Sequence, residues 1–259
     1  VTLNQIKKLM NYDNVINMDI RSVIAGINVN EKDSFNSEIY NDKNSMYSFK
    51  ELLSWIADQK SIFNLSVRRL DLNKLKEWKV SENIIEHKQS KFFKVIGADV
   101  RIGNREVVNW CQPMIETEED GLIVFIVKKI NGKIHFLMQA KVEIGNLDII
   151  ELAPTVQCLT GSYKNSSGNK LPFLDYVLKS DKKNIVYDSL QSEEGGRFYR
   201  EQNRNMIIEA SLNFPSDVPP NYIWMTYNQI HAFMLFSNYV NIQSRSLLSY
   251  IKACDEEIS

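Results

Sequence analysis

Apolar residues recur at intervals of three or four positions near both ends of the chain. Residues 4–27 show this spacing and are predicted to form one or two helices. Ser48-Phe49-Lys50-Glu51 carries the serine and glutamate of a capping box, so a further helix is predicted to begin at residue 49. Near the C-terminus, the same spacing predicts helices over residues 226–236 and 244–253.

The middle of the chain follows a strand pattern instead. Residues 122–130 and 133–140 are two apolar runs joined by Asn131-Gly132, which is the clearest hairpin signal in the sequence. Helices at both ends of a strand-rich middle predict an α+β fold with a mixed or antiparallel sheet. The shorter strand-like runs are residues 92–102, 107–110, 149–152, 185–187 and 206–209.

A polar stretch separates the first helices from the rest of the chain. Residues 28–48 are rich in Asn, Ser, Asp and Lys and contain few large apolar side chains, so we interpret them as a linker or loop. We therefore expect an N-terminal helical extension with its linker at residues 1–48 and a single module at residues 49–259. Within that module, residues 73–78 suggest one more short helical segment.

Composition narrows the class of protein. The 259 residues are 44% hydrophobic and 24% charged, with a formal net charge of −1, so no global field attracts nucleic acid or anionic lipid. The longest apolar run, residues 121–127, is too short to span a membrane. The first residues show no leader pattern, and the three cysteines are too scattered for a disulfide framework or a zinc site. We therefore expect a cytoplasmic protein without a metal site.

One charged segment, residues 191–205, stands out as a candidate binding site. Guanidinium groups bind phosphate or carboxylate through paired hydrogen bonds, and the Gly195-Gly196 pair would let a ligand approach the backbone. The same charges could form salt bridges on a solvated helix face, so the segment alone leaves both interpretations open. If the segment is helical, four charged residues share one stripe: Glu193, Arg197, Arg200 and Arg204.

Six blocks of sequence, in order, resemble the NDP-hexose 2,3-dehydratases of deoxysugar biosynthesis. No single block is a strong motif, but together they cover roughly residues 50–251. The blocks are residues 87–93 (HKQSKFF), 110–113 (WCQP), 135–143 (HFLMQAKVE), 152–157 (LAPTVQ), 192–205 (SEEGGRFYREQNRN) and 238–245 (NYVNIQSR).

The resemblance implies a Nudix-like α/β/α sandwich around a central mixed sheet, preceded here by the N-terminal helical segment. Familiar members of that family are longer and contain two copies of the module, whereas this chain carries one, so a homodimer is expected. The metal-binding Nudix box is absent, because Glu193-Glu194-Gly195-Gly196 lacks the upstream Arg-Glu pair. A magnesium-dependent hydrolase is therefore disfavoured.

The resemblance also implies a reaction. The substrate would be a dTDP-4-keto-6-deoxyhexose, whose 4-ketone acidifies the C3 hydrogen. A base removes that proton, the C2 hydroxyl leaves as water, and the enol tautomerises to a 3,4-diketo-2,6-dideoxy sugar. No cofactor is implied, and an NAD(P)H-dependent 3-ketoreductase is expected to act on the product.

The candidate catalytic residues are acids, bases and donors within or near the matching blocks. Lys141 and Glu143 are two positions apart on a predicted strand and so face one side, where they could hold an oxyanion and move a proton; a solvent-facing pair is the alternative. The sequence identifies no unique base, and Glu194 is a further option. The full set is Lys141, Glu143, Glu151, Glu193 and Tyr163.

The candidate substrate-binding residues supply guanidinium, amide and hydroxyl groups. Arginines suit the diphosphate, and the amides and the threonine suit the sugar or the base. The alternatives are surface ion pairs for the arginines and capping or core hydrogen bonds for the others. The set is Thr155, Gln157, Arg197, Arg200, Arg204, Asn205, Asn241 and Arg245.

Two other functions remain open from the sequence. The first is a Nudix-type nucleotide-sugar hydrolase, which the missing metal box disfavours. The second is a non-catalytic nucleotide-sugar-binding subunit of a larger dehydratase. A nucleic-acid binder is a weaker third, because the locally basic residues 67–79 are balanced by acids elsewhere in the chain.

Overall fold

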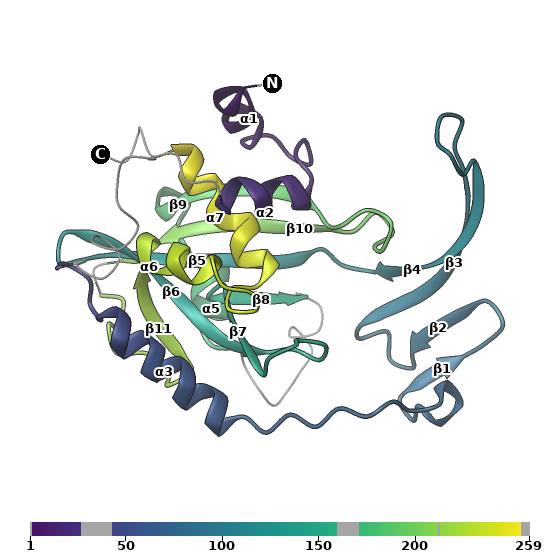
Figure 1. Ribbon diagram of the computed structural model, residues 1–259, viewed down its shortest axis with the longest axis horizontal. Helices are drawn as coiled ribbons and strands as arrows, with labels where there is room; N and C mark the ends of the chain where they lie inside the picture. Colours follow the sequence, from purple (N-terminus) through teal and green to yellow (C-terminus); the bar gives the residue numbers. More distant parts are fainter. Residues whose placement is uncertain (1, 27–42, 160–170, 212, 255–259) are drawn as a thin grey trace.

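The computed structural model describes residues 2–26, 43–159, 171–211 and 213–254. Within them, the chain forms a four-stranded antiparallel sheet and a larger, mixed seven-stranded sheet (Figure 1). The α+β fold with a mixed sheet that the sequence predicts is therefore confirmed. The strands of the smaller sheet, in spatial order, are β1 (Trp78–Val80), β2 (Ile84–His87), β3 (Phe93–Arg101) and β4 (Asn109–Thr117).

The larger sheet has the strand order β11-β6-β5-β10-β9, with β7 added to β6 and β8 added to β5. Strand β10 runs parallel to β5, and the other pairs are antiparallel. Its strands are β5 (Gly121–Ile130), β6 (Lys133–Val142), β7 (Ile150–Ala153), β8 (Val156–Leu159), β9 (Ile185–Ser192), β10 (Gln202–Glu209) and β11 (Tyr222–Thr226).

Helices cover both faces of this sheet. One face packs against α3, α6 and α7, and the other packs against α5 and the segment around Phe214. Because both faces are covered, residues 121–127 of β5 are buried without alternation. The helices are α1 (Leu3–Leu9), α2 (Met18–Gly26), α3 (Phe49–Ile62), α5 (Leu174–Leu178), α6 (Tyr227–Met234) and α7 (Ile242–Cys254), with 3₁₀ turns η1 (Leu72–Lys74) and η2 (Lys182–Asn184). No helix in the described part of the chain is long and apolar enough to cross a membrane.

Local sequence signals predicted several elements correctly. The capping box of Ser48 and Glu51 is present at the start of α3. Asn131 and Gly132 both have positive φ, 52° and 82°, as a two-residue hairpin turn between β5 and β6 requires. The N-terminal helices α1 and α2 and the C-terminal helices α6 and α7 are confirmed. Of the predicted linker, residues 28–42 lie outside the described residues.

Two predictions about helices are wrong. Residues 73–78 give only the 3₁₀ turn η1 followed by strand β1. Residues 191–205 are not helical either: β9 ends at Ser192, β10 begins at Gln202, and a loop with positive φ at Gly196 (85°) and Arg200 (55°) joins them. The reason is long-range pairing, because Gln202 to Glu209 complete a ladder with β9 on one side and β5 on the other.

The N-terminal helical segment packs closely on the larger sheet. Arg21 of α2 is buried, and its guanidinium donates to the Gln191 side chain (2.9 Å), the Ser192 carbonyl (3.0 Å) and the Ser246 hydroxyl (2.6 Å). Asn14 adds a backbone hydrogen bond to the carbonyl of Leu190 at 2.9 Å. Residues before the predicted linker therefore hold the end of β9 in place.

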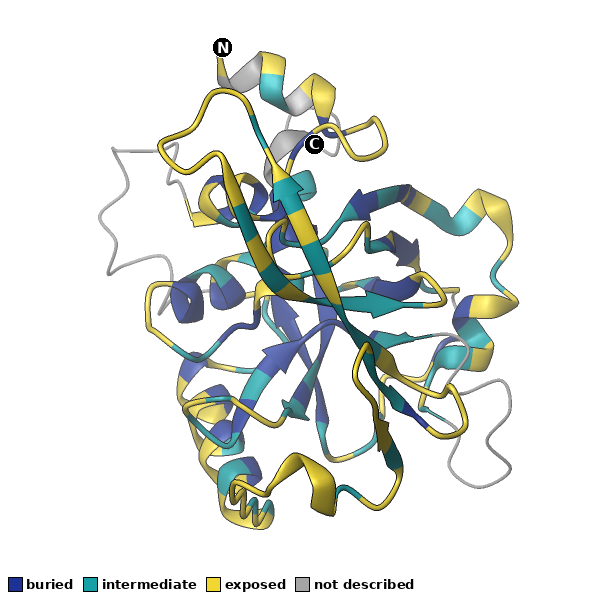
Figure 2. Ribbon diagram, turned by 90° about the vertical axis from the view of Figure 1, so that its right-hand side faces the viewer, coloured by how far each residue is buried: buried dark blue, intermediate teal, exposed yellow. Residues whose placement is uncertain are grey.

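The smaller sheet has little core of its own. Figure 2 shows β3 and β4 as a long ribbon of intermediate and exposed residues, and neither strand contains a buried one. The base of the ribbon joins the β9–β10 loop, because Ile115 accepts from the Tyr199 amide (2.7 Å) and donates to the Arg197 carbonyl (2.8 Å). The ribbon thereby supports one side of that loop.

The β5–β6 hairpin opens into a fork at Thr155. The two strands pair from Ile130 and Lys133 at the turn to Val127 and Phe136, and then β8 and β7 fill the space between them. Thr155 is fully buried at the branch, where its hydroxyl accepts from the Ile126 amide (2.9 Å) and donates to the Leu137 carbonyl (2.5 Å). One hydroxyl thus replaces a direct backbone bond between the diverging strands.

Replacing Thr155 by valine should destabilise the protein, because the Ile126 amide and the Leu137 carbonyl would lose their buried partner. We expect a loss of about 2–4 kcal/mol in the free energy of unfolding, measured by urea denaturation. Thr155→Ser keeps the hydroxyl and is the matched control, with an expected loss below about 1.5 kcal/mol from the missing methyl group. Equal losses in the two variants would contradict the hydroxyl's role.

Candidate active site

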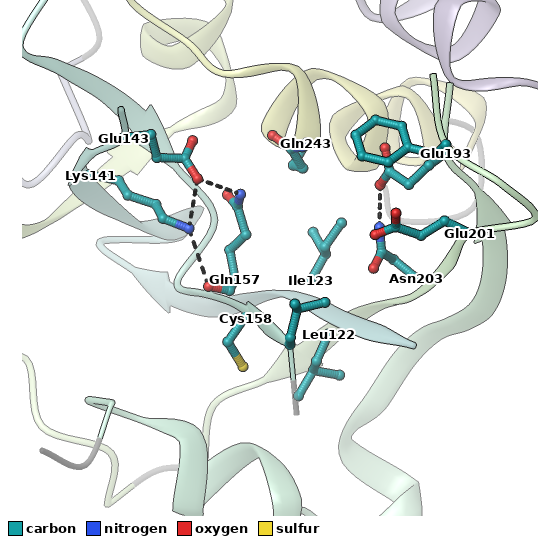
Figure 3. Close-up of a pocket in the computed structure, with 12 residues that line it drawn as sticks. Leu122, Ile123, Lys141, Glu143, Gln157, Cys158, Glu193, Glu201, Asn203 and Gln243 are labelled. Carbon is teal, nitrogen blue, oxygen red and sulfur yellow. Dashed lines mark hydrogen bonds and ion pairs between the residues drawn. The ribbon is translucent and has the colours of Figure 1, made fainter. Parts of the chain in front are cut away.

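A pocket of about 220 Å³ lies beside the open arms of this fork (Figure 3). Strands β5 and β8 form its floor, the end of β6 with Glu143 just after it forms one wall, and the β9–β10 loop with the start of β10 forms the other. Residues from 122–159, from 193–203 and Gln243 of α7 therefore meet here. The lining residues are Leu122, Ile123, Lys141, Glu143, Gln157, Cys158, Leu159, Glu193, Phe198, Glu201, Asn203 and Gln243.

The first wall contains an ion pair with hydrogen bonds around it. The Lys141 ammonium lies 3.2 Å from the Glu143 carboxylate and donates to the Gln157 carbonyl at 3.2 Å. The side-chain amide of Gln157 donates to the same Glu143 carboxylate at 3.2 Å. Figure 3 shows the three side chains together on one side of the pocket. The expectation that Lys141 and Glu143 face one side is confirmed.

Helix α7 anchors this wall. The Asn241 amide donates to the Gln157 side-chain oxygen at 2.8 Å, and its own oxygen accepts from the Ser244 amide at 2.9 Å, at the start of α7. The Arg245 guanidinium instead donates to the Val240 carbonyl. Glu151 pairs with Lys141 across β6 and β7, and burial, then Glu143, raises the pKa of its carboxyl while Arg245 lowers it. Neither Arg245 nor Glu151 lines the pocket.

The opposite wall carries two carboxyl groups. The Asn203 amide donates to the Glu193 carboxylate. Burial raises the pKa of Glu193, against the opposing effects of the Asn203 hydrogen bond and the Arg21 guanidinium. Burial, and next the charge of Glu193, raises the pKa of Glu201 to about 7. The sequence pattern identified Glu193 but missed Glu201 and Asn203.

A glycine makes room for this wall. Gly121 pairs with Asn203 across β5 and β10, and a β-carbon at residue 121 would lie 1.8 Å from the side-chain oxygen of Asn203. Real β-carbons essentially never approach another atom so closely, so any other residue would push the Asn203 amide away from Glu193. The close approach of the Asn203 side chain, rather than the backbone angles, favours glycine at this position.

The structure separates the three arginines predicted to bind phosphate. Arg204 is exposed on the face of β10 opposite Asn203, where its guanidinium forms two hydrogen bonds with Asp188 at 2.7 and 2.5 Å. Arg197 is exposed beside Glu194 at 3.3 Å, and Arg200 lies against the ring of Tyr199. The structure therefore does not bring Arg204 to the pocket, whereas Arg197 and Arg200 belong to the loop whose Phe198 lines it.

The remaining predicted residues have varied positions. Thr155 occupies the fork and does not line the pocket. Asn205 is buried, and its amide donates to the Asn203 carbonyl at 3.0 Å. Tyr163 lies outside the described residues.

Cys158 lines the floor of the pocket, and burial raises the pKa of its thiol to about 11, so the thiol stays protonated near neutral pH. In the described residues, no group of three His, Cys, Asp or Glu side chains could hold a metal ion.

A two-residue period would have placed the missed residues together on one face of a strand. Glu201, directly before β10, alternates with Asn203 and Asn205 in the strand, so the three face one side of the sheet and Arg204 faces the other. The helical interpretation grouped Arg204 with Glu193 instead.

Comparison with known proteins gives the family. The family model of the NDP-hexose 2,3-dehydratases matches residues 49–251, which include every residue that lines the pocket. The chain belongs to the NDP-hexose 2,3-dehydratase family. Arg21 lies outside that region, so a residue beyond the matched segment holds the end of β9 in this family member.

Three curated relatives resemble this family member over nearly its whole length, and each is named dTDP-4-dehydro-6-deoxy-alpha-D-glucopyranose 2,3-dehydratase. The protein of Amycolatopsis orientalis is 38% identical over 98% of the chain, and that of Saccharopolyspora spinosa is 36% identical over 96%. The protein of Streptomyces violaceoruber is 33% identical over 95%. The alignments cover 52–55% of the relatives, so the chain spans about half of their length.

Substituting Gly121 by alanine should disrupt the carboxyl wall, because the new methyl group would displace the Asn203 amide from Glu193. We expect a loss of about 1–3 kcal/mol in the free energy of unfolding, measured by urea denaturation. Gly97→Ala in β3 is the matched control, since a β-carbon there meets no atom within 4 Å. If the Gly121→Ala protein is as stable as the Gly97→Ala protein, the Asn203 side chain moves aside without cost and the prediction is wrong.

Proposed function

We propose that the chain is a sugar-nucleotide 2,3-dehydratase acting on dTDP-4-keto-6-deoxyglucose, a lyase of deoxysugar biosynthesis. The observation that carries the proposal is the pocket: a Lys141–Glu143 ion pair faces two carboxyl groups across a partly apolar floor. Membership of the family and the names of the relatives support the substrate class.

The reaction needs a donor at the C4 oxygen and a base at the neighbouring C3 hydrogen. Lys141 and Glu143 fit this pair of roles, because their charged groups are 3.2 Å apart and C3 and C4 are bonded neighbours. The ammonium stabilises the enolate oxygen that forms when Glu143 takes the C3 proton. Gln157 and Asn241 hold the carboxylate in position through the hydrogen bonds described above.

The nucleotide part of the substrate would extend toward the β9–β10 loop. Phe198 lines the pocket, and Arg197 and Arg200 are exposed on either side of it. Exposed guanidinium groups close in sequence to a residue that lines the pocket suit a diphosphate, whose charge need not be desolvated. These two arginines suit the diphosphate better than Arg204, which pairs with Asp188 on the opposite face of β10.

Further features belong to the same proposal. Pairing of two copies as a homodimer, expected from the family resemblance, is part of the same proposal. An NAD(P)H-dependent 3-ketoreductase would consume the reactive diketone.

A mixed sheet covered by helices on both faces supports a Nudix-like module at residues 49–259. The packing of Arg21 supports counting the N-terminal extension with that module.

The proposed reaction can be tested with the purified chain, dTDP-4-keto-6-deoxyglucose and an NADPH-dependent 3-ketoreductase. Mass spectrometry should show loss of one water from the sugar nucleotide before reduction. Glu143→Gln should lower kcat by about 10²–10⁴-fold, as removal of a general base does. Glu106→Gln, at the exposed tip of the β3–β4 ribbon, is the matched control. Release of dTMP and sugar 1-phosphate without dehydration would favour a hydrolase, and substrate binding without turnover would favour a non-catalytic subunit.

Changing Arg197 and Arg200 to alanine should weaken binding of dTDP by about tenfold to a hundredfold for each guanidinium group removed, since charge-assisted hydrogen bonds contribute about 1.5–3 kcal/mol. Isothermal titration calorimetry with dTDP measures the effect. Arg105→Ala at the exposed ribbon tip controls for loss of a positive charge. Arg204→Ala tests the sequence prediction directly, and a loss of affinity there alone would mean that the diphosphate lies on the other face of β10.

A further inference from the structure

Glu193 and Glu201 form a cross-strand pair at the end of the β9–β10 ladder. The ladder pairs Ser192 with Gln202, and the Glu193 amide continues it by donating to the Glu201 carbonyl at 3.0 Å. Both side chains line the pocket, and Figure 3 shows them on the same wall, across from Lys141 and Glu143. Two carboxyl groups that share one partly buried site do not both ionise readily.

The surroundings of the two carboxyl groups differ. Glu193 accepts the hydrogen bond of Asn203 and lies in the field of the Arg21 guanidinium, and both favour its charged form. One oxygen of Glu201, Oε2, is buried and has no hydrogen-bond partner among the described residues. A buried carboxylate without a partner is costly, whereas a protonated carboxyl can keep that position. The geometry therefore leaves the charge on Glu193 and the proton on Glu201.

We propose that Glu201 is the general acid of the dehydration, and that Glu193 is the charged neighbour that keeps the proton on it. This assignment rests on the proposed function. It adds the group that the Lys141–Glu143 wall does not supply, namely a proton donor for the departing hydroxyl. Because Lys141 and Glu143 occupy one wall, a sugar with C3 and C4 against them directs its C2 side to the wall of Glu201.

The step conserves atoms and charge. Glu143 takes the C3 proton, and the electron pair of that bond delocalises into the C4 carbonyl as an enolate held by Lys141. The enolate then re-forms the carbonyl, its electrons make the C2–C3 double bond, and the C2–O bond breaks. Glu201 gives its proton to the leaving oxygen, so water departs and Glu201 becomes a carboxylate. The enol product tautomerises to the 3,4-diketone by moving a proton from the C3 hydroxyl to C2.

The electrostatics agree with this assignment. Burial and the charge of Glu193 raise the pKa of Glu201 to about 7, so a large fraction of Glu201 carries its proton in neutral solution. Around the Glu193–Glu201 pair, the charged and titratable groups are Arg21 from α2, Glu194 from the loop and, across the pocket, Lys141, Glu143 and Cys158. An acid must be protonated to act, so kcat should fall as the pH rises through about 7.

The test compares Glu201→Gln and Glu193→Gln with the wild type, and Glu209→Gln, an exposed residue at the far end of β10, is the matched control. We measure kcat from pH 5.5 to 9 and exchange of the C3 hydrogen with deuterated solvent. Glu201→Gln should lower kcat by about 10²–10⁴-fold and remove the fall above pH 7, while exchange at C3 continues. Glu193→Gln should move the fall to lower pH, because the charge that raises the pKa of Glu201 is gone.

Each outcome separates the two claims. Wild-type kcat and an unchanged pH profile in Glu201→Gln would overturn the acid role and leave the proposed function standing. Loss of C3 exchange together with dehydration in that variant would also overturn it, because Glu201 would then act in proton removal. No dehydration by the wild-type chain would overturn the proposed function and the acid role together. A ¹³C NMR titration of the Glu201 carboxyl, independent of turnover, should show a midpoint near pH 7 that falls in Glu193→Gln; a midpoint in the ordinary range of glutamate would contradict the pairing.

Discussion

The hydroxyl of Thr155 fixes the shape of the larger sheet and, with it, the position of the pocket. By accepting from Ile126 and donating to Leu137, it satisfies two buried backbone groups at the point where β5 and β6 stop pairing. Without such a bridge, the strands would have to close into a plain hairpin or leave polar groups unpaired in an apolar core. The opening admits β7 and β8, and β8 forms the floor of the pocket together with β5.

The two walls of the pocket differ in their electrostatics because different groups support them. On the β6 wall, the ammonium of Lys141 lies beside a carboxylate, so charge is balanced locally. On the other wall, the Asn203 amide donates to Glu193 beside Glu201, and burial raises the pKa of both carboxyl groups. Such a pair separates a charge-bearing group from a proton-bearing one, which is the division of roles that an elimination needs. The buried Arg21, from the N-terminal segment, stabilises the charge on its own side.

Several features of the fold and the site could be predicted from local sequence. The capping box before residue 49 and the Asn131-Gly132 turn depend on neighbouring residues only, and both are present. The two-residue period of a strand predicts Lys141 and Glu143 on one face, and the ion pair confirms it. The helix predicted after Ser192 is wrong, because charges that recur every three or four residues are not enough to form one. A glycine pair and two strand partners, one parallel and distant in sequence, make the segment a loop and a strand instead.

The sequence by itself determined the α+β class, the main hairpin, the helices at both ends and the family resemblance, because these depend on patterns within short windows or blocks. Only the tertiary structure decided that Glu201 and Asn203 face a pocket while Arg204 faces Asp188 on the other side of β10. It also decided that Arg21 supports a wall from far away in the chain. The reason is physical: pairing between distant segments decides which face of a strand meets the pocket, and burial there shifts the pKa of a side chain, and neither is encoded in the neighbouring residues.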